Sequence, residues 1–158
     1  MGHPLANLLL FPKQTASRPG QALERIASNG DGGIAGLNVL IAEDDVLTAA
    51  DLVSAFEDMG VRIVGPASTV RDALELVEQA ERLDGAVIDI ELRGGTAYPI
   101  AEALVKRGTP FVFATGYSQT AIHASFSNIV ACEKPASPER IARALFGDSR
   151  INAVRLKA

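Results

Sequence analysis

The chain has 158 residues, enough for one domain with a buried core and a short extension. Its 47% hydrophobic content argues against disorder, and a formal charge of −4 without a basic block argues against a nucleic-acid partner. The early apolar run "LLLF" is far too short to span a bilayer. It also lacks the flanking features of a signal peptide. The lone Cys132 excludes an internal disulfide and fits a reducing compartment, so we expect a soluble cytoplasmic protein without a membrane partner.

From Leu37 onward, short apolar runs alternate with segments of helical periodicity. Several runs are rich in Val and Ile, and near-continuous apolarity is typical of parallel strands that helices cover on both faces. The spacing of most runs, about two dozen residues, suits βα units with crossover helices. The predicted strands are 37–42, 62–67, 85–90, 110–115 and 128–132.

Apolar stripes at helical spacing predict helices between these strands. The stripes contain Ala49, Val53, Phe56 and Met59; Val70, Ala73, Leu74 and Val77; and Ile100, Ala103 and Leu104. A fourth helix over 137–147 has Ser137 as its N-cap and Gly147 as its stop. Residues 116–127 contain few strong helix formers, which predicts a short or labile helix there.

The order of these elements predicts an α/β fold, a doubly wound (βα)₅ parallel sheet. We expect this domain to span residues 36–147. Residues 1–35 contain Pro12, Pro19 and the glycine-rich "SNGDGG", with one modest helical pattern around "QALERIAS". They are predicted to be a partly flexible N-terminal extension, and 148–158 a C-terminal tail.

Polar residues follow four of the five predicted strands. In an open parallel sheet, ligands bind beyond the carboxyl ends of the strands, so these residues are candidates for a site. Taken singly, each has an ordinary explanation as a solvated acid, a turn residue, a β-branched strand residue or a surface lysine. The candidates are Glu43 and Asp44 after the first strand, Asp89 at the end of the third, Thr115 at the end of the fourth, and Lys134 after the fifth. The third acid after the first strand, Asp45, suits the N-cap of the next helix.

Taken together, these residues predict phosphoryl chemistry. Three crowded carboxylates repel one another and offer the hard oxygen ligands that Mg²⁺ prefers. A carboxylate is also a competent nucleophile toward phosphorus and forms an aspartyl phosphate. Lys134 supplies a cation, and Thr115 a hydroxyl donor, for the charge on a transferring phosphoryl group.

Four motifs, "VLIAEDD", "AVIDIELRGG", "FVFATGY" and "EKP", make the chain resemble the receiver domains of two-component response regulators. The resemblance covers about residues 36–147 and implies a flavodoxin-like sheet of order 2-1-3-4-5. It implies that Asp89 is the phosphoacceptor and that Mg²⁺ is held by Glu43, Asp44, Asp89 and the backbone carbonyl of Glu91. It also implies that Thr115 is the switch hydroxyl, that Lys134 contacts the phosphoryl group, and that the Lys134–Pro135 peptide bond is cis.

The stretch "FATGY" is similar to an alphaproteobacterial receiver subclass, the FATGUY type, which is often partnered with histidine kinases of the HWE type. Tyr117 directly follows Gly116 here, so the match to the signature is partial. Many receivers carry a switching aromatic residue where this chain has Ala131. We hypothesise that Tyr117 substitutes for it, and that Gly116 keeps the approach to the phosphoryl group clear.

The resemblance implies a signalling domain rather than an enzyme of metabolism. It would accept a phosphoryl group from a sensor histidine kinase or a histidine phosphotransfer protein, and then act on a downstream protein by contact. Because no recognisable output domain follows Gly147, a stand-alone receiver is expected, with a piece of a longer regulator as the alternative. A pseudo-receiver that binds a partner without phosphorylation is a second hypothesis. A flavin or phosphohydrolase site is a third, which the acidic, glycine-free turn "AEDDVLT" disfavours.

Overall fold

The computed structural model describes residues 33–147, and its centre is a five-stranded parallel sheet. The strand order is β2-β1-β3-β6-β7, which confirms the predicted flavodoxin-like order 2-1-3-4-5. The strands are β1 (Asn38–Ala42), β2 (Arg62–Ala67), β3 (Gly85–Ile88), β6 (Phe111–Thr115) and β7 (Ala131–Glu133). The helical pattern around "QALERIAS" and the tail 148–158 lie outside the described residues.

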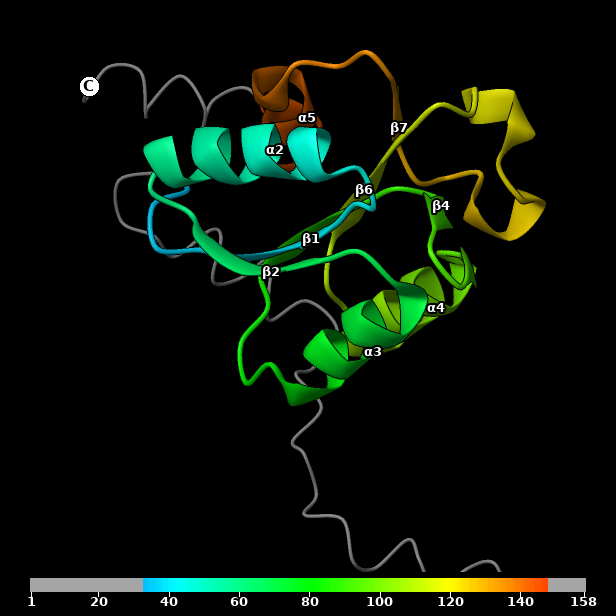
Figure 1. Cartoon of the computed structure of the whole chain (residues 1–158), viewed down its shortest axis with the longest axis horizontal. Coiled ribbons are helices and arrows are strands. Elements are labelled where there is room, and N and C mark those ends of the chain that lie inside the picture. The colour runs from blue at the N-terminus through cyan, green and yellow to red at the C-terminus, as the bar shows by residue number, and fades with distance from the viewer. Residues whose placement is uncertain (1–32, 148–158) are drawn as a thin grey trace, which may run out of the picture.

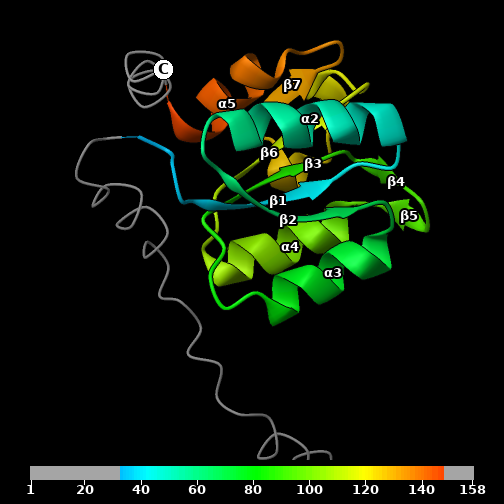
Figure 2. The ribbon, with the colours of Figure 1, turned by 60° about the vertical axis from the view of Figure 1, so that its left-hand side comes forward.

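Two pairs of helices cover the two faces of the sheet. Figure 1 and Figure 2 show α2 and α5 on one face and α3 and α4 on the other. The helices are α2 (Val46–Asp58), α3 (Val70–Gln79), α4 (Tyr98–Arg107) and α5 (Pro138–Phe146). The three apolar stripes and the capped segment 137–147 therefore all form helices, and none of these helices is long and apolar enough to cross a membrane.

Side-chain caps fix where three of these helices begin. The side chain of Asp45 accepts a hydrogen bond from the backbone N–H of Thr48, and that of Ser137 accepts one from Arg140. Both caps confirm the sequence predictions, and Thr69 caps α3 in the same way. Such caps satisfy N–H groups that have no partner within the helix. At the other end of α4, Gly108 adopts a left-handed conformation (φ 71°) that suits glycine.

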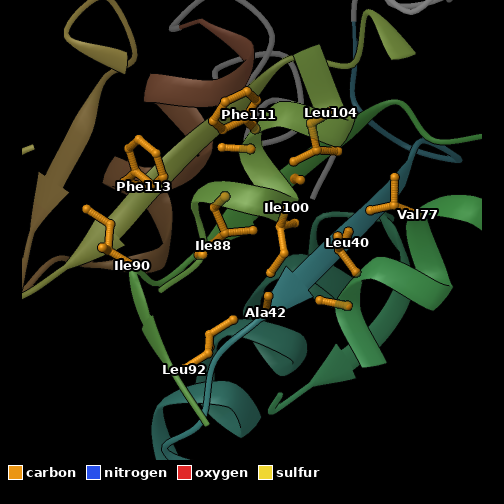
Figure 3. Close-up of a cluster of buried hydrophobic side chains, with 14 of the residues drawn as sticks. Leu40, Ala42, Val77, Ile88, Ile90, Leu92, Ile100, Leu104, Phe111 and Phe113 are labelled. Atoms are coloured by element: carbon orange, nitrogen blue, oxygen red, sulfur yellow. The ribbon is translucent and has the colours of Figure 1, made fainter. Parts of the chain in front are cut away.

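The core consists of one hydrophobic cluster on each face of the sheet. Successive residues of a strand point to opposite faces, and β1 follows this rule. Its Leu40 and Ala42 join the cluster beneath α3 and α4, which Figure 3 shows, whereas Val39 and Ile41 join the cluster beneath α2 and α5. Because both faces are covered, β1, β3 and β6 are buried along nearly their whole length.

A short antiparallel hairpin follows β3 and was not predicted. The third strand ends at Ile88 rather than at residue 90, and β4 (Glu91–Leu92) then pairs with β5 (Gly95–Thr96). The backbone of Arg93 ties this hairpin to the loop between β2 and α3. Its N–H donates to Ser68 O at 3.2 Å, and its carbonyl accepts from the N–H of Val70 at 3.0 Å.

The segment between β6 and β7 forms two separate 3₁₀ turns, η2 (Gln119–Ala121) and η3 (Ala124–Phe126), in place of one short helix. Phe126 anchors the segment, because its buried ring stacks on Tyr98 with centroids 5.5 Å apart. The strand predicted at 128–132 begins only at Ala131. The Gln119 side chain hydrogen-bonds to the backbone around the start of β7. It donates to Ile129 O and accepts from the N–H of Ala131.

Candidate functional site

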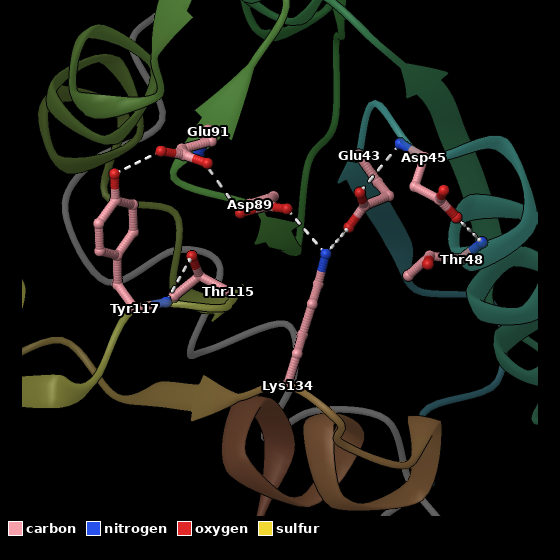
Figure 4. A network of polar contacts seen from close by, with 8 residues as sticks. All are labelled: Glu43, Asp45, Thr48, Asp89, Glu91, Thr115, Tyr117 and Lys134. Carbon is pink, nitrogen blue, oxygen red and sulfur yellow. Dashed lines mark hydrogen bonds and ion pairs between the residues drawn. The ribbon is translucent and has the colours of Figure 1, made fainter.

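The predicted site residues meet at one edge of the sheet. Parallel strands end on the same side, so residues that are far apart in the sequence become neighbours. Glu43 and Asp44 follow β1, Asp89 follows β3, Thr115 ends β6 and Lys134 follows β7. Figure 4 shows the polar contacts that link Glu43, Asp89, Thr115 and Lys134 to their neighbours.

The acidic residues form a cluster that could hold a metal ion. Carboxylate oxygens of Glu43, Asp44 and Asp89 lie within 4.8 Å of one another. Glu43 and Asp89 are buried, with 3% and 8% of their surfaces exposed, and Asp44 is half-buried. Three hard oxygen donors of like charge at this separation fit a small divalent cation such as Mg²⁺.

Lys134 reaches across the site and pairs with two of these acids. Its Nζ lies 2.6 Å from Glu43 Oε2 and 2.7 Å from Asp89 Oδ2. Burial alone would lower the pKa of Lys134, but hydrogen bonds to Asp89 and Glu43 outweigh it and raise that pKa. The ammonium group therefore stays charged and offsets part of the negative charge of the cluster.

Burial disfavours the ionised form of Glu43. Desolvation raises its pKa above the ordinary 4.5, although hydrogen bonds from Lys134 and from the backbone N–H of Asp45 act in the opposite direction. Nearby Asp89 adds to the rise through charge repulsion. Because its ionised form is disfavoured, Glu43 gains in particular from a cation at the cluster.

Thr115 ends β6, and Asp89 directly follows the neighbouring strand β3. The Thr115 side chain is buried, with 1% of the residue exposed, and its Oγ1 accepts the N–H of Tyr117 at 3.4 Å. Asp89 Oδ1 accepts the N–H of Glu91 at 3.3 Å, which leaves Oδ2 facing Lys134. Both side chains thus bond to the backbone two residues onward.

A hydrogen bond between Tyr117 and Glu91 joins the loops that follow β6 and β3. The hydroxyl of Tyr117 donates to the Glu91 carboxylate, as Figure 4 shows. This hydrogen bond, with the negative charge of Glu91, raises the pKa of Tyr117. Sequence reasoning singled out both residues but missed their contact, because no local signal links positions 26 residues apart.

Three further positions were singled out in the sequence: the Lys134–Pro135 peptide bond, Gly116 and Ala131. The Lys134–Pro135 peptide bond is cis, as the resemblance implied. A Cβ at Gly116 would meet no atom within 4 Å, so packing does not require glycine there. At Ala131 the small side chain is partly buried against the cluster beneath α3 and α4, which also contains Phe126. Sequence reasoning missed Phe126 as the residue that anchors the segment between β6 and β7. The available signal was its spacing of four residues from Ile122, which is also buried.

Comparisons with known proteins agree with this geometry. No family model matches the chain. It is 39% identical to SdrG from Pseudomonas melonis Fr1, solved in its BeF3-activated conformation, over 70% of this chain and 94% of that one, with a TM-score of 0.59. It is 27% identical to the receiver domain of the response regulator PhyR from Erythrobacter litoralis, over 71% and 92% of the two chains, with a TM-score of 0.61.

Among curated proteins, the chain is 35% identical over 82 residues to the transcriptional regulatory protein PdtaR of Mycobacterium tuberculosis. That match covers 51% of this chain and 40% of PdtaR, so the chain spans less than half of the relative's length. The fold and the acidic site define a signalling domain of the two-component type. The chain belongs to the family of response regulator receiver domains.

Proposed function

We propose that Asp89 accepts a phosphoryl group from the phosphohistidine of a sensor kinase or a histidine phosphotransfer protein. The observation that carries this proposal is the grouping of Glu43, Asp44 and Asp89 within 4.8 Å, with Lys134 Nζ 2.7 Å from the Asp89 carboxylate. SdrG, which is 39% identical, is described in a BeF3-activated conformation, and this supports the same kind of activation here.

In the proposed step, a carboxylate oxygen of Asp89 attacks phosphorus in line with the departing imidazole nitrogen. An O–P bond forms, the N–P bond breaks, and the released electron pair stays on the imidazole nitrogen, which then takes up a proton. Lys134 contacts a phosphoryl oxygen and balances its charge. Glu43, Asp44, Asp89 and the backbone carbonyl of Glu91 would hold Mg²⁺, which, when bound, neutralises the phosphoryl oxygens.

The response to phosphorylation is proposed to pass through Thr115. Its hydroxyl turns from the N–H of Tyr117, where the bond is long at 3.4 Å, to a phosphoryl oxygen on Asp89. This shift biases the segment of two 3₁₀ turns that follows β6. Hydrolysis resets the domain, and we hypothesise that Glu91 and Tyr117 set its rate, since both flank the site.

Tyr117 is also proposed to replace the switching aromatic residue, whose usual position is occupied by Ala131 in this chain. Its side chain is 38% exposed and reaches Glu91, so it is free to exchange one partner for another. Tyr117→Phe and Tyr117→Ala should both change the amide spectrum of the phosphorylated protein. If neither variant alters the phosphorylation-induced changes, this role for Tyr117 is wrong.

The finer assignment is a stand-alone receiver of the FATGUY type that acts by protein contact and takes its phosphoryl group from an HWE-type kinase. The sequence "FATGY" and the 39% identity to SdrG support it. A panel of purified kinases from the source organism would test it: the HWE-type members should phosphorylate the chain fastest. Faster transfer from every kinase of another type would contradict the assignment.

Phosphorylation itself is tested with the full chain, acetyl phosphate and Mg²⁺, followed by intact-mass analysis. One phosphoryl group should be gained by the wild type and by Asp72→Asn, a control acid on the outside of α3. Asp89→Asn should gain none. Label on Asp89→Asn would overturn the assignment of the acceptor, and an unlabelled wild type with every donor would favour the pseudo-receiver hypothesis.

A further inference from the structure

A groove between α2 and α5 opens beside the proposed phosphorylation site. It has a volume of about 500 Å³. Most of its lining is apolar, including Leu52, Ala114, Pro135 and Ile141, and the acid Asp51 also lines it. A concave apolar surface of this kind suits a short apolar segment, because burial removes both surfaces from water.

One exposed aliphatic side chain extends this apolar surface. Leu47, the second residue of α2, is 76% exposed, more than any other large hydrophobic residue in the described range 33–147. Leu47 lies one helical turn before Asp51, and residues four apart share a helix face. Leu47 therefore continues the rim of the groove toward the start of α2.

The charges of the chain are unevenly divided. Residues 33–147 contain 16 acidic and nine basic residues, a formal charge of −7, whereas the whole chain carries −4. Helix α2 contains acidic residues but no Lys or Arg, and Asp44 and Asp45 precede it directly. Residues 1–32 contain three basic and two acidic residues, and residues 148–158 contain three basic residues and one acidic residue, so both flanking regions have a positive formal charge. The acidic face at α2 thus has complementary charges in both flanking regions of the same chain.

The N-terminal region contains a segment that matches the groove. Residues 8–11 read "LLLF", no charged residue precedes them, and Lys13 follows two positions later. The chain enters the domain at Ile34, which packs in one cluster with Phe56 and Phe146 near the far ends of α2 and α5.

The connecting residues are long enough for the segment to reach the groove. Residues 12–32 can span about 70 Å when extended. Helix α2, whose length separates the entry point from the groove, is about 20 Å long. A tether of this length holds the segment at an effective concentration on the order of millimolar, so a weak apolar contact suffices.

We propose that residues 8–11 of the same chain dock in the groove between α2 and α5, against Leu47, with Lys13 facing Asp51. The docked segment covers the apolar surface at the start of α2 and lies beside Lys134. It therefore competes with any protein that approaches the site from this side. The proposal does not depend on phosphorylation of Asp89.

A nitroxide on Ala6→Cys tests this placement in the ¹⁵N-labelled full chain. The native Cys132 is buried, and unlabelled wild type treated with the same reagent is the control for selectivity. Amide signals of residues 47–52 and 139–141 should lose most of their intensity. Those of α3, on the opposite face of the sheet, should keep theirs. Equal loss on both faces, or no loss, would overturn the proposal.

Substitutions separate specific docking from chance contact. Leu8→Ser with Leu10→Ser should restore the intensities. Leu47→Ser should restore them too, and it should have little effect on folding because Leu47 is exposed. Val105→Ser is the matched control, since Val105 is 56% exposed on α4 and should leave the losses unchanged. Losses that persist with serines in the segment contradict the proposal.

A mixed sample identifies the occupant. Chain labelled with ¹⁵N but without nitroxide is combined with unlabelled chain that carries the nitroxide. Its signals should keep their intensity, because the segment binds its own domain. Loss in the mixture would show that a second copy supplies the segment, and the same-chain proposal would then be wrong.

Discussion

Lys134 and Asp89 are 45 residues apart in the sequence, yet the ammonium group of one lies 2.7 Å from the carboxylate of the other. The same ammonium group lies 2.6 Å from Glu43. One cation thus serves two buried acids while a third acid, Asp44, is nearby. The cluster keeps an excess of negative charge, and this excess is the physical reason to expect a divalent cation there.

Removing Lys134 should therefore destabilise the protein in a way that Mg²⁺ repairs. Lys134→Ala leaves two buried carboxylates without their partner, and we expect the free energy of unfolding to fall by about 2 kcal/mol without metal. Mg²⁺ should stabilise this variant more than the wild type. Urea denaturation with and without Mg²⁺ measures both effects. Arg71→Ala is the control, since its pair with Glu75 is exposed and worth at most about 0.5 kcal/mol.

Affinity for Mg²⁺ should weaken on acidification earlier than an ordinary glutamate would predict. The pKa of Glu43 is raised above 4.5 by burial, and protons compete with the metal for its carboxylate. Affinity should already fall as the pH drops toward 4.5 from above, as titration calorimetry can measure. Glu43→Gln should bind more weakly and lose this part of the pH dependence. An identical pH profile for the variant would contradict the role of Glu43.

The raised pKa of Glu43 also makes the stability of the metal-free protein depend on pH. A carboxyl whose pKa is raised by folding favours the folded state in its protonated form. Its contribution is fully present below pH 4.5 and is lost as the pH rises through the raised pKa. Metal binding should reverse this loss, since it stabilises the ionised carboxylate.

The hydrogen bond between Tyr117 and Glu91 should be visible in an alkaline titration. The pKa of Tyr117 lies above the ordinary 10.0 because of its hydrogen bond to Glu91 and the charge of that residue. In Glu91→Ala, tyrosinate absorbance should therefore appear at lower pH. Tyr117→Phe identifies the signal by removing it, which leaves Tyr98 as the remaining tyrosine. An unchanged titration in Glu91→Ala would show that the contact does not persist in solution.

Two glycines should respond oppositely to alanine. Gly116→Ala should change stability by less than about 0.5 kcal/mol, because the added Cβ meets no atom within 4 Å. Gly60→Ala should cost more than about 1 kcal/mol, since Gly60 has a φ of +85° and the Cβ would lie 2.9 Å from that of Ala35. Thermal denaturation of both variants decides this. Equal losses of stability in Gly116→Ala and Gly60→Ala would contradict the local geometry described for one of the two glycines.

Phe126 should hold the segment between β6 and β7 in place. Phe126→Ala removes a buried ring that stacks on Tyr98 and meets Phe113 edge-on, and should cost about 3 kcal/mol. Hydrogen exchange should accelerate first in residues 119–127. Val130→Ala, at a residue that is 50% exposed, is the control and should change little. A uniform acceleration across the sheet would mean that Phe126 supports the whole core instead.

The sequence predicted the parallel sheet and the location of its candidate site, because both depend on periodicity and on the edge where parallel strands end. The sequence alone was enough to place four residues at one site: Glu43, Asp89, Thr115 and Lys134. The hairpin of β4 and β5 could not, since two residues per strand are too few to show alternation. The start of β7 was also missed, because an apolar run does not reveal where pairing with β6 begins.

The backbone link between Arg93 and the loop before α3 has a consequence for how the domain can respond. The loop that follows Asp89 continues into a hairpin that this link fastens to the edge of the sheet. Across the site, the loop that follows Thr115 leads into two single turns held by a few side chains. The site thus has one wall that backbone hydrogen bonds tie to a neighbouring loop and one wall that consists of two single turns. We therefore expect a chemical change at Asp89 to displace the Thr115 side before the hairpin side.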